Sequence, residues 1–125
     1  MFKKLFGSSE PKDKKVLPWI ALTSKAQLAD ITKKSEGKTQ VVFKHSTRCG
    51  ISSMVLRQFE AAYDLDLNVD LYFLDLLNYR DVSNEVGEQF QVMHQSPQLI
   101  VIRNGVVVAH ESHGAINELD LERFV

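Results

Sequence analysis

Cys49 is the only cysteine in the 125-residue sequence and the residue best suited to nucleophilic redox chemistry. Ser52 follows three residues later, which is one turn on the same face if a helix begins here. The first N–H groups of a helix concentrate positive potential and so stabilise a thiolate. A serine hydroxyl can donate a hydrogen bond to that thiolate but cannot form a disulfide. The spacing predicts thiol–disulfide exchange with an external sulfur. The alternative is that Ser52 has no role at the thiol and is present only because serine is favourable in the first turn of a helix.

Basic residues and a glycine surround the cysteine. Lys44, His45 and Arg48 lie just before it, and positive charge favours a thiolate. Gly50 leaves little bulk over the sulfur, so that a disulfide partner can approach. Free cysteines are often buried packing residues. This one follows a polar turn instead of lying on an apolar stripe, which favours a reactive role.

A second candidate segment is Ser96-Pro97, which immediately precedes a predicted hairpin. A cis bond here would present the Ser96 backbone toward the Cys49 helix. An ordinary trans loop proline is the more frequent outcome, because only about 5–6% of X-Pro bonds are cis. His94 lies just before this segment and either borders the thiol site or is a plain loop histidine.

Composition excludes several classes of protein. Fifteen Lys+Arg against sixteen Asp+Glu leave no global field for nucleic acid or an anionic membrane. One cysteine excludes an internal disulfide and any metal site that needs two thiolates from one chain. His110 and His113 point to opposite faces of a strand, so they are not expected to share a metal. We expect a cytoplasmic protein. The apolar runs are too short to span a membrane, no export signal is recognised, and a lone thiol suits a reducing compartment.

The hydrophobic pattern predicts elements that place these residues. Helices are expected over residues 25–35, from Cys49 to about Ala62, over 80–91 and over 116–125, and strands over 39–44, 69–75, 98–103 and 106–110. Thr23 or Ser24 is expected to cap the first helix, with Gly37 ending it, and Asn117 to cap the last.

The element order predicts one α/β domain over residues 17–125 after a flexible segment over residues 1–16. A strand–helix–strand unit crosses over into a parallel pair, because such connections are right-handed and adjacent. Asn104-Gly105 then closes an antiparallel hairpin at one side. We therefore expect a four-stranded mixed sheet flanked by helices, with an N-terminal helix extension.

The order of these features resembles the thioredoxin-like fold. Its signs are Cys49-Gly50-Ile51-Ser52 opening a helix after a strand, and Ser96-Pro97 leading into the hairpin. The stretch from Lys44 to Ser52, Lys-His-Ser-Thr-Arg-Cys-Gly-Ile-Ser, is more particular. It resembles the YtxJ-type monothiol bacilliredoxins, and the similarity runs from about Trp19 to the C-terminus.

The resemblance implies a glutaredoxin-like activity that removes a low-molecular-weight thiol, bacillithiol, from protein mixed disulfides. Carried over, Cys49 is the nucleophile, Ser52 holds the resolving position as a hydrogen-bond donor to the thiolate, and Pro97 is a cis-proline. Many relatives place proline after the cysteine, so Gly50 is expected to loosen the helix start. The residues expected to contact substrate are Lys44, His45, Arg48, Gly50, Ser96 and His94.

The implied partners are S-thiolated client proteins and a low-molecular-weight thiol as co-substrate. No cofactor, metal, nucleic acid or membrane is expected. Two other classes of function stay open. One is a [2Fe–2S] cluster held by Cys49 of two chains and two small thiols. The other is a thioredoxin-like binding module without enzymatic activity, in which Cys49 is inert.

Overall fold

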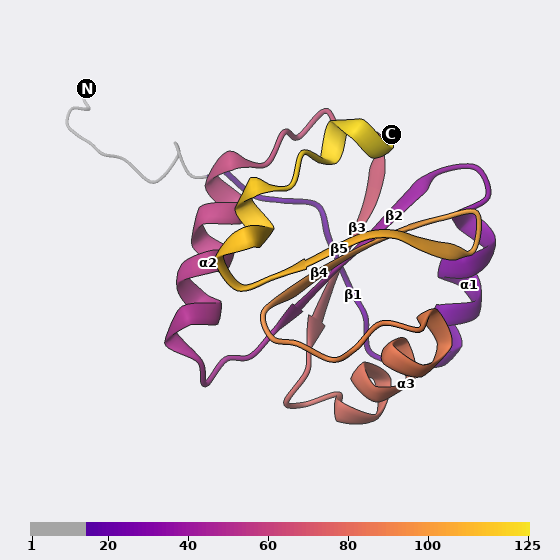
Figure 1. The fold of residues 1–125 in the computed structure, drawn as a ribbon, viewed down its shortest axis with the longest axis horizontal. Coiled ribbons are helices and arrows are strands. Elements are labelled where there is room, and N and C mark those ends of the chain that lie inside the picture. Colours follow the sequence, from indigo (N-terminus) through magenta and orange to yellow (C-terminus); the bar gives the residue numbers. More distant parts are fainter. Residues whose placement is uncertain (1–14) are drawn as a thin grey trace, which may run out of the picture.

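A five-stranded mixed sheet organises residues 15–125, the part of the chain that the computed structural model describes (Figure 1). The flexible segment predicted over residues 1–16 lies outside this range up to residue 14. In chain order the elements are β1 (Trp19–Ala21), α1 (Ala26–Lys34), β2 (Thr39–His45), α2 (Gly50–Ala62), β3 (Val69–Asp75), α3 (Arg80–Phe90), β4 (Gln98–Arg103), β5 (Val106–Ser112) and two 3₁₀ helices, η2 (His113–Glu118) and η3 (Leu121–Phe124). No helix in residues 15–125 is long and apolar enough to cross a membrane.

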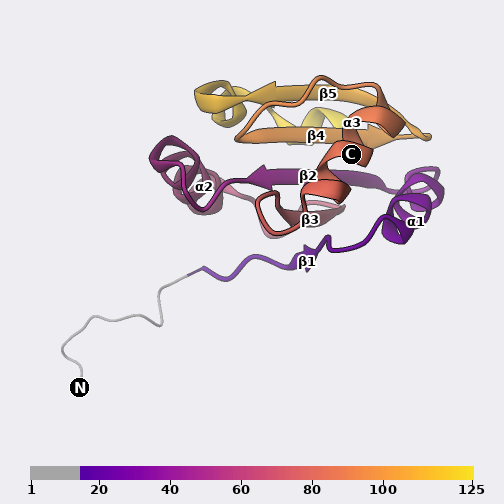
Figure 2. The same ribbon diagram turned by 90° about the horizontal axis from the view of Figure 1, so that it is seen from below.

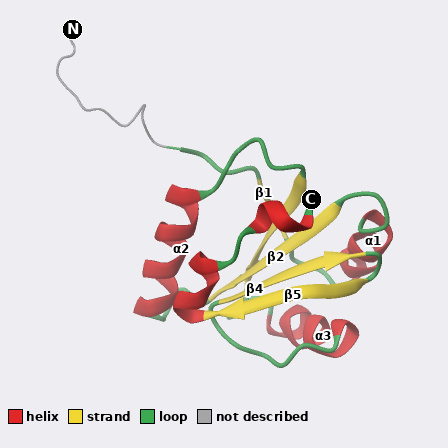
Figure 3. Ribbon diagram, turned by 45° about the horizontal axis from the view of Figure 1, so that its top comes forward, coloured by secondary structure: helices red, strands yellow, loops and turns green. Residues whose placement is uncertain are grey.

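The strands lie in the order β1-β3-β2-β4-β5. β2 pairs parallel with β3 and antiparallel with β4, as the predicted crossover and hairpin require. α2 and the two 3₁₀ helices cover one face of the sheet, whereas α1 and α3 cover the other (Figures 2 and 3). Each face has its own apolar core, and alternate residues of β2 belong to different cores: Phe43 packs toward α2 and Val42 toward α1 and α3.

The expected count of four strands was wrong. Trp19–Ala21 forms a fifth strand, β1, parallel to residues 71–73 of β3. Three residues are too few to show strand alternation, and tertiary contacts hold them in place. The Trp19 ring lies edge-on to Phe43 and Phe73, and its Nε1 donates to Glu60 Oε2 at 3.0 Å.

The start and the end of the first predicted helix also differ from expectation. Neither Thr23 nor Ser24 caps α1 with its side chain; instead Gln27 Oε1 accepts both of their backbone N–H groups, at 2.8 and 3.0 Å. α1 ends at Lys34, three residues before Gly37. The polar side chain of the first turn therefore reaches back to the preceding backbone, in the reverse of the expected cap.

The predicted final helix over residues 116–125 is replaced by η2 and η3. Leu119 and Asp120 between them are extended, which lets both Ile116 and Leu121 reach the core under α2. Asn117 lies inside η2 and donates to Gln58 Oε1 at 3.2 Å instead of capping a helix. The burial of Ile116 and Leu121, which lie on two separate 3₁₀ turns, thus takes the place of a continuous helix.

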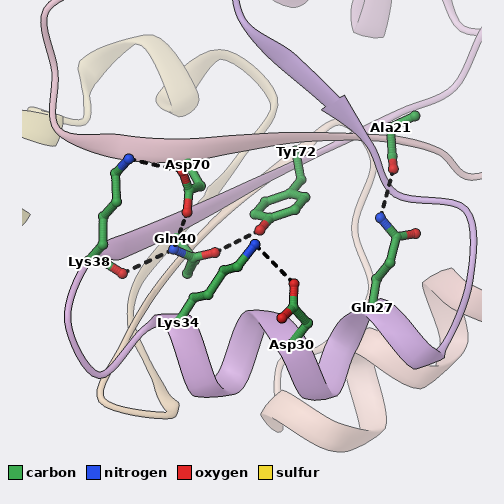
Figure 4. A network of polar contacts seen from close by, with 8 residues as sticks. All are labelled: Ala21, Gln27, Asp30, Lys34, Lys38, Gln40, Asp70 and Tyr72. Carbon is green, nitrogen blue, oxygen red and sulfur yellow. Dashed lines mark hydrogen bonds and ion pairs between the residues drawn. The ribbon is translucent and has the colours of Figure 1, made fainter.

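A partly buried polar network ties the amino end of β2 to β3 (Figure 4). Tyr72 Oη donates to Gln40 Oε1 at 2.8 Å, and Gln40 Nε2 donates to Asp70 Oδ2 at 2.8 Å. Lys38 forms an ion pair with Asp70 at 3.1 Å. The side chain of Gln40 is thereby satisfied at both its amide atoms. Since Cys49 follows the other end of β2, this network serves the sheet and not the thiol.

The Asn104-Gly105 turn supplies a stability prediction. Asn104 and Gly105 have φ values of 53° and 79°, as the predicted hairpin turn requires. Gly105→Ala is expected to lower the free energy of unfolding by about 1 kcal/mol, because a Cβ disfavours positive φ. That Cβ would meet Thr32 Cγ2 at an ordinary 3.6 Å, so the cost lies in the backbone. Urea unfolding measures it. Gly37→Ala, where a Cβ meets nothing within 4 Å, is the control, and equal effects would contradict the prediction.

Candidate functional site

Cys49 lies at the N-cap of α2, directly after the polar turn that ends β2. Its backbone is extended, with φ −109° and ψ 119°, and its side chain is half-buried. Its carbonyl accepts the Ser53 N–H at 3.1 Å, and its own N–H donates to Ser46 O at 3.2 Å. The predicted placement is confirmed: the thiol belongs to the end of the helix where unpaired N–H groups concentrate positive potential.

Ser52 does not make the expected bond to the thiol. Its side chain is fully buried, and its Oγ lies 2.8 Å from His45 Nδ1 and accepts the Ser46 N–H at 3.1 Å. Both partners belong to the end of β2 and the turn after it. The hydroxyl points inward because this face of α2 packs on the sheet. Ser52 therefore fastens the first turn of α2 to β2, and the expectation that it hydrogen-bonds Cys49 is corrected.

His45 is likewise corrected as a substrate contact, because its side chain is only 6% exposed. Its ring packs against Phe73, with ring centroids 5.6 Å apart. Burial lowers the pKa of His45, and the negative charges of Asp75 and Glu60 oppose that effect in part. Burial beneath α2 thus favours the neutral imidazole, which contacts Ser52.

The loop before β4 lies at the same edge of the sheet as Cys49. Lys44 pairs with Gln98 in the antiparallel register, so residues just before Gln98 approach the segment just after β2. The Ser96-Pro97 peptide bond is cis, as the resemblance implied. Pro97 is buried, and its carbonyl accepts the His113 N–H at 3.0 Å. The Ser96 hydroxyl is buried and has no hydrogen-bond partner among the described residues.

Lys44 lies on the opposite face of the sheet from its neighbour His45. Its side chain is fully buried, and its Nζ lies 3.3 Å from Nδ1 of His94, which is exposed. Burial lowers the pKa of Lys44 to about 8. The pKa of His94 is also lowered, first by partial burial and then by the positive charges of Lys44 and Arg80.

Arg48 and Gly50 flank the cysteine on the exposed side. Both residues are exposed, and a Cβ at Gly50 would meet nothing within 4 Å. Local packing thus does not require the glycine, because the space around a side chain at position 50 is open. Farther along the outer face of α2, Ile51 and Met54 are exposed, at 55% and 46%. These apolar side chains give the surface beside Cys49 the character of a protein contact.

Sequence reasoning missed three contributors to the site. They are Ser46, whose N–H holds Ser52, Arg80, whose charge reaches His94, and Gln98, whose Oε1 is buried without a partner among the described residues. Gln98 could have been found from the pairing of β2 with β4, which places it beside Lys44, but the sequence does not give the register of that pairing. Arg80 comes from α3, and nothing in the sequence places it beside the loop before Pro97.

Two other regions do not belong to this site. A pocket of about 280 Å³ lies at the carboxyl end of α2, between Tyr63 and the 3₁₀ helices, far along the helix from Cys49. Across residues 15–125, no group of three or more His, Cys, Asp or Glu side chains is arranged to hold a metal ion.

Comparison with known proteins agrees with this geometry. A family model described as "Monothiol bacilliredoxin BrxC" matches residues 20–121. A solved protein with a thioredoxin fold is 31% identical and superposes with a TM-score of 0.72, over 84% of this chain and 91% of that one. Thioredoxin from Schistosoma mansoni is 17% identical (TM-score 0.68, covering 86% and 95%), and thioredoxin f from spinach chloroplast is 19% identical (0.65, covering 89% and 94%). The last two share the fold.

Proposed function

The chain belongs to the monothiol bacilliredoxin family and has the thioredoxin fold, and we propose that it removes a low-molecular-weight thiol, bacillithiol, from S-thiolated client proteins in the cytoplasm. The observation that carries the proposal is the position of the single cysteine, at the N-cap of α2 and at the sheet edge that also bears cis-Pro97. With only one thiol, Cys49 has to work through an intermolecular adduct.

The exchange proceeds in two displacements. The Cys49 thiolate attacks the small-thiol sulfur of a client mixed disulfide; a disulfide forms between Cys49 and the small thiol, and the client sulfur leaves as a thiolate that takes a proton from water. A second small-thiol thiolate then attacks the sulfur bound to Cys49. That step releases a symmetrical small-molecule disulfide and returns the Cys49 thiolate, so atoms and electrons balance over the cycle.

The remaining side chains have separate roles in the proposal. Arg48 and Gly50 border the incoming disulfide, and Ser96 and Pro97 form the opposite wall. Ser52 and His45 act from beneath, because they hold the first turn of α2 against β2. Exposed Ile51 and Met54 contact the client. No step requires a metal or a bound cofactor.

Intact-mass spectrometry tests the proposal. The protein is incubated with a client peptide that carries bacillithiol on its cysteine. The wild type is expected to gain the mass of one bacillithiol as the peptide loses it, whereas Cys49→Ser gains none. Ser53→Ala, a change in the same helical turn, is the matched control and retains the transfer. Wild type and Cys49→Ser behaving alike would sink the proposal and favour an inert binding module.

A further inference from the structure

Lys44 and His94 form a pair whose hydrogen-bonding roles follow from chemistry. The Lys44 side chain is fully buried, and its Nζ has one hydrogen-bond partner among the described residues, His94 Nδ1 at 3.3 Å. An ammonium group only donates, so Nδ1 accepts and the proton of the neutral ring lies on Nε2. His94 is exposed, which leaves its Nε2–H free to meet a ligand.

The charge of this pair is not balanced by a carboxylate. The ion pairs between described residues are Lys34–Asp30 and Lys38–Asp70, and neither includes Lys44. The charges that reach His94 come from Lys44 and Arg80, and both are positive. A buried charge without a counter-charge is costly, and a bound anion relieves that cost.

The loop between His94 and β4, together with the first residue of that strand, holds further polar atoms without partners. Ser96 Oγ and Gln98 Oε1 are both buried and unbonded within residues 15–125. The loop also carries cis-Pro97 and lies at the edge of the sheet that bears Cys49. The Lys44–His94 pair therefore lies at the same edge of the sheet that Cys49 follows, and this is the side on which a small thiol would be bonded to the sulfur.

Given the proposed function, we propose that His94 donates its Nε2–H to a carboxylate of the low-molecular-weight thiol, while Lys44 holds the ring from behind with its buried ammonium. His94 is the contact residue. Lys44 is a positioning residue, because its side chain is covered and acts through His94. The site thus selects thiols that bear a carboxylate over neutral thiols of the same size.

A pair of disulfides that differ only in that charge tests the inference. One client peptide carries N-acetylcysteine and a second carries N-acetylcysteine amide. The rate of transfer to Cys49 is measured for each by mass spectrometry. The wild type is expected to take the carboxylate-bearing thiol roughly tenfold faster, since a charge-assisted hydrogen bond is at stake.

Variants then assign the preference to the pair. His94→Leu and Lys44→Met are expected to bring the ratio of the two rates close to one. His94→Gln keeps most of the preference, because its amide oxygen accepts from Lys44 and its amide nitrogen donates outward. Equal rates with the wild type, or a preference unchanged in His94→Leu, overturn the inference but leave the proposed function intact. Transfer of neither analogue by the wild type also overturns the inference, and failure to take bacillithiol from its client peptide overturns the proposed function as well.

Discussion

Replacing Ser52 with cysteine is expected to change a protein whose adduct persists into one that resolves its adduct internally. The introduced thiol lies one helical turn from Cys49, on the same helix. It attacks the Cys49 sulfur of the adduct, forms an intramolecular disulfide and expels the small thiol as a thiolate. The wild type has no second thiol with which to do this.

Mass spectrometry without added reductant reads out the Ser52→Cys result. The variant is expected to lose the small-thiol adduct and to weigh two hydrogens less than its reduced form. Met54→Cys is the matched control: its side chain is exposed, and it lies five residues on, off the face that Cys49 shares with Ser52. That variant is expected to keep the adduct. Persistence of the adduct in Ser52→Cys would contradict the position of the helix start.

The same substitution has a cost in stability. The Ser52 hydroxyl accepts the Ser46 N–H and bonds to His45 Nδ1, and sulfur is a weak replacement in both contacts. A loss of about 1–3 kcal/mol is expected, which is the usual penalty for leaving a buried polar group unpaired. Urea unfolding of the reduced variant measures it separately from the effect of the disulfide.

Lys44→Met is expected to stabilise the folded protein at neutral pH by about 3 kcal/mol. Burial lowers the pKa of Lys44 from its ordinary 10.5 to about 8, so the folded chain holds the ammonium less readily than the unfolded chain does. A shift of that size corresponds to about 3 kcal/mol against the folded state below pH 8. Methionine fills a similar volume without a charge.

The pH dependence distinguishes this cause from simple packing. Between pH 8 and 10.5 the unfolded wild type binds more protons than the folded one, so wild-type stability rises with pH across that window. The advantage of Lys44→Met should therefore shrink as pH rises through it. Urea unfolding at pH 7 and at pH 10 measures the change, with Lys33→Met, on the exposed side of α1, as control. A variant less stable than wild type at pH 7 would show that the ammonium is paired.

A stabilising loss of Lys44 would also bear on function. A buried lysine without a carboxylate is a poor choice for stability, and residues retained at a cost to stability are common at functional sites. The inferred role of Lys44 in positioning His94 would explain why a residue that lowers stability is present at this position. Lys44→Met would then gain stability and lose the preference for carboxylate-bearing thiols in the same protein.

Several features could be predicted from the residues alone. The helix start at Cys49 follows from the change of period after a polar turn, and the Asn104-Gly105 turn from the need for positive φ at two positions. Strand β3 follows from its alternation, β2 from a short apolar run, and β4 and β5 from the apolar runs that flank the Asn104-Gly105 turn. These are local properties, which a short window of sequence contains. The resemblance then implied the cis bond before Pro97, which the structure confirms.

Only the tertiary structure decided which side chains these residues contact. Alternation in a strand places Lys44 and His45 on opposite faces, but it does not say which helix covers each face. The crossover puts α2 over His45, so that Ser52 bonds to His45 and Ser46 instead of to the thiol. The antiparallel pairing of β4 with β2 brings His94 to Lys44. The sequence by itself identified Cys49 as the candidate nucleophile, because a lone cysteine at a helix start is a local feature. Contacts between distant segments decided what supports it, since those depend on register and packing, which no short window of sequence contains.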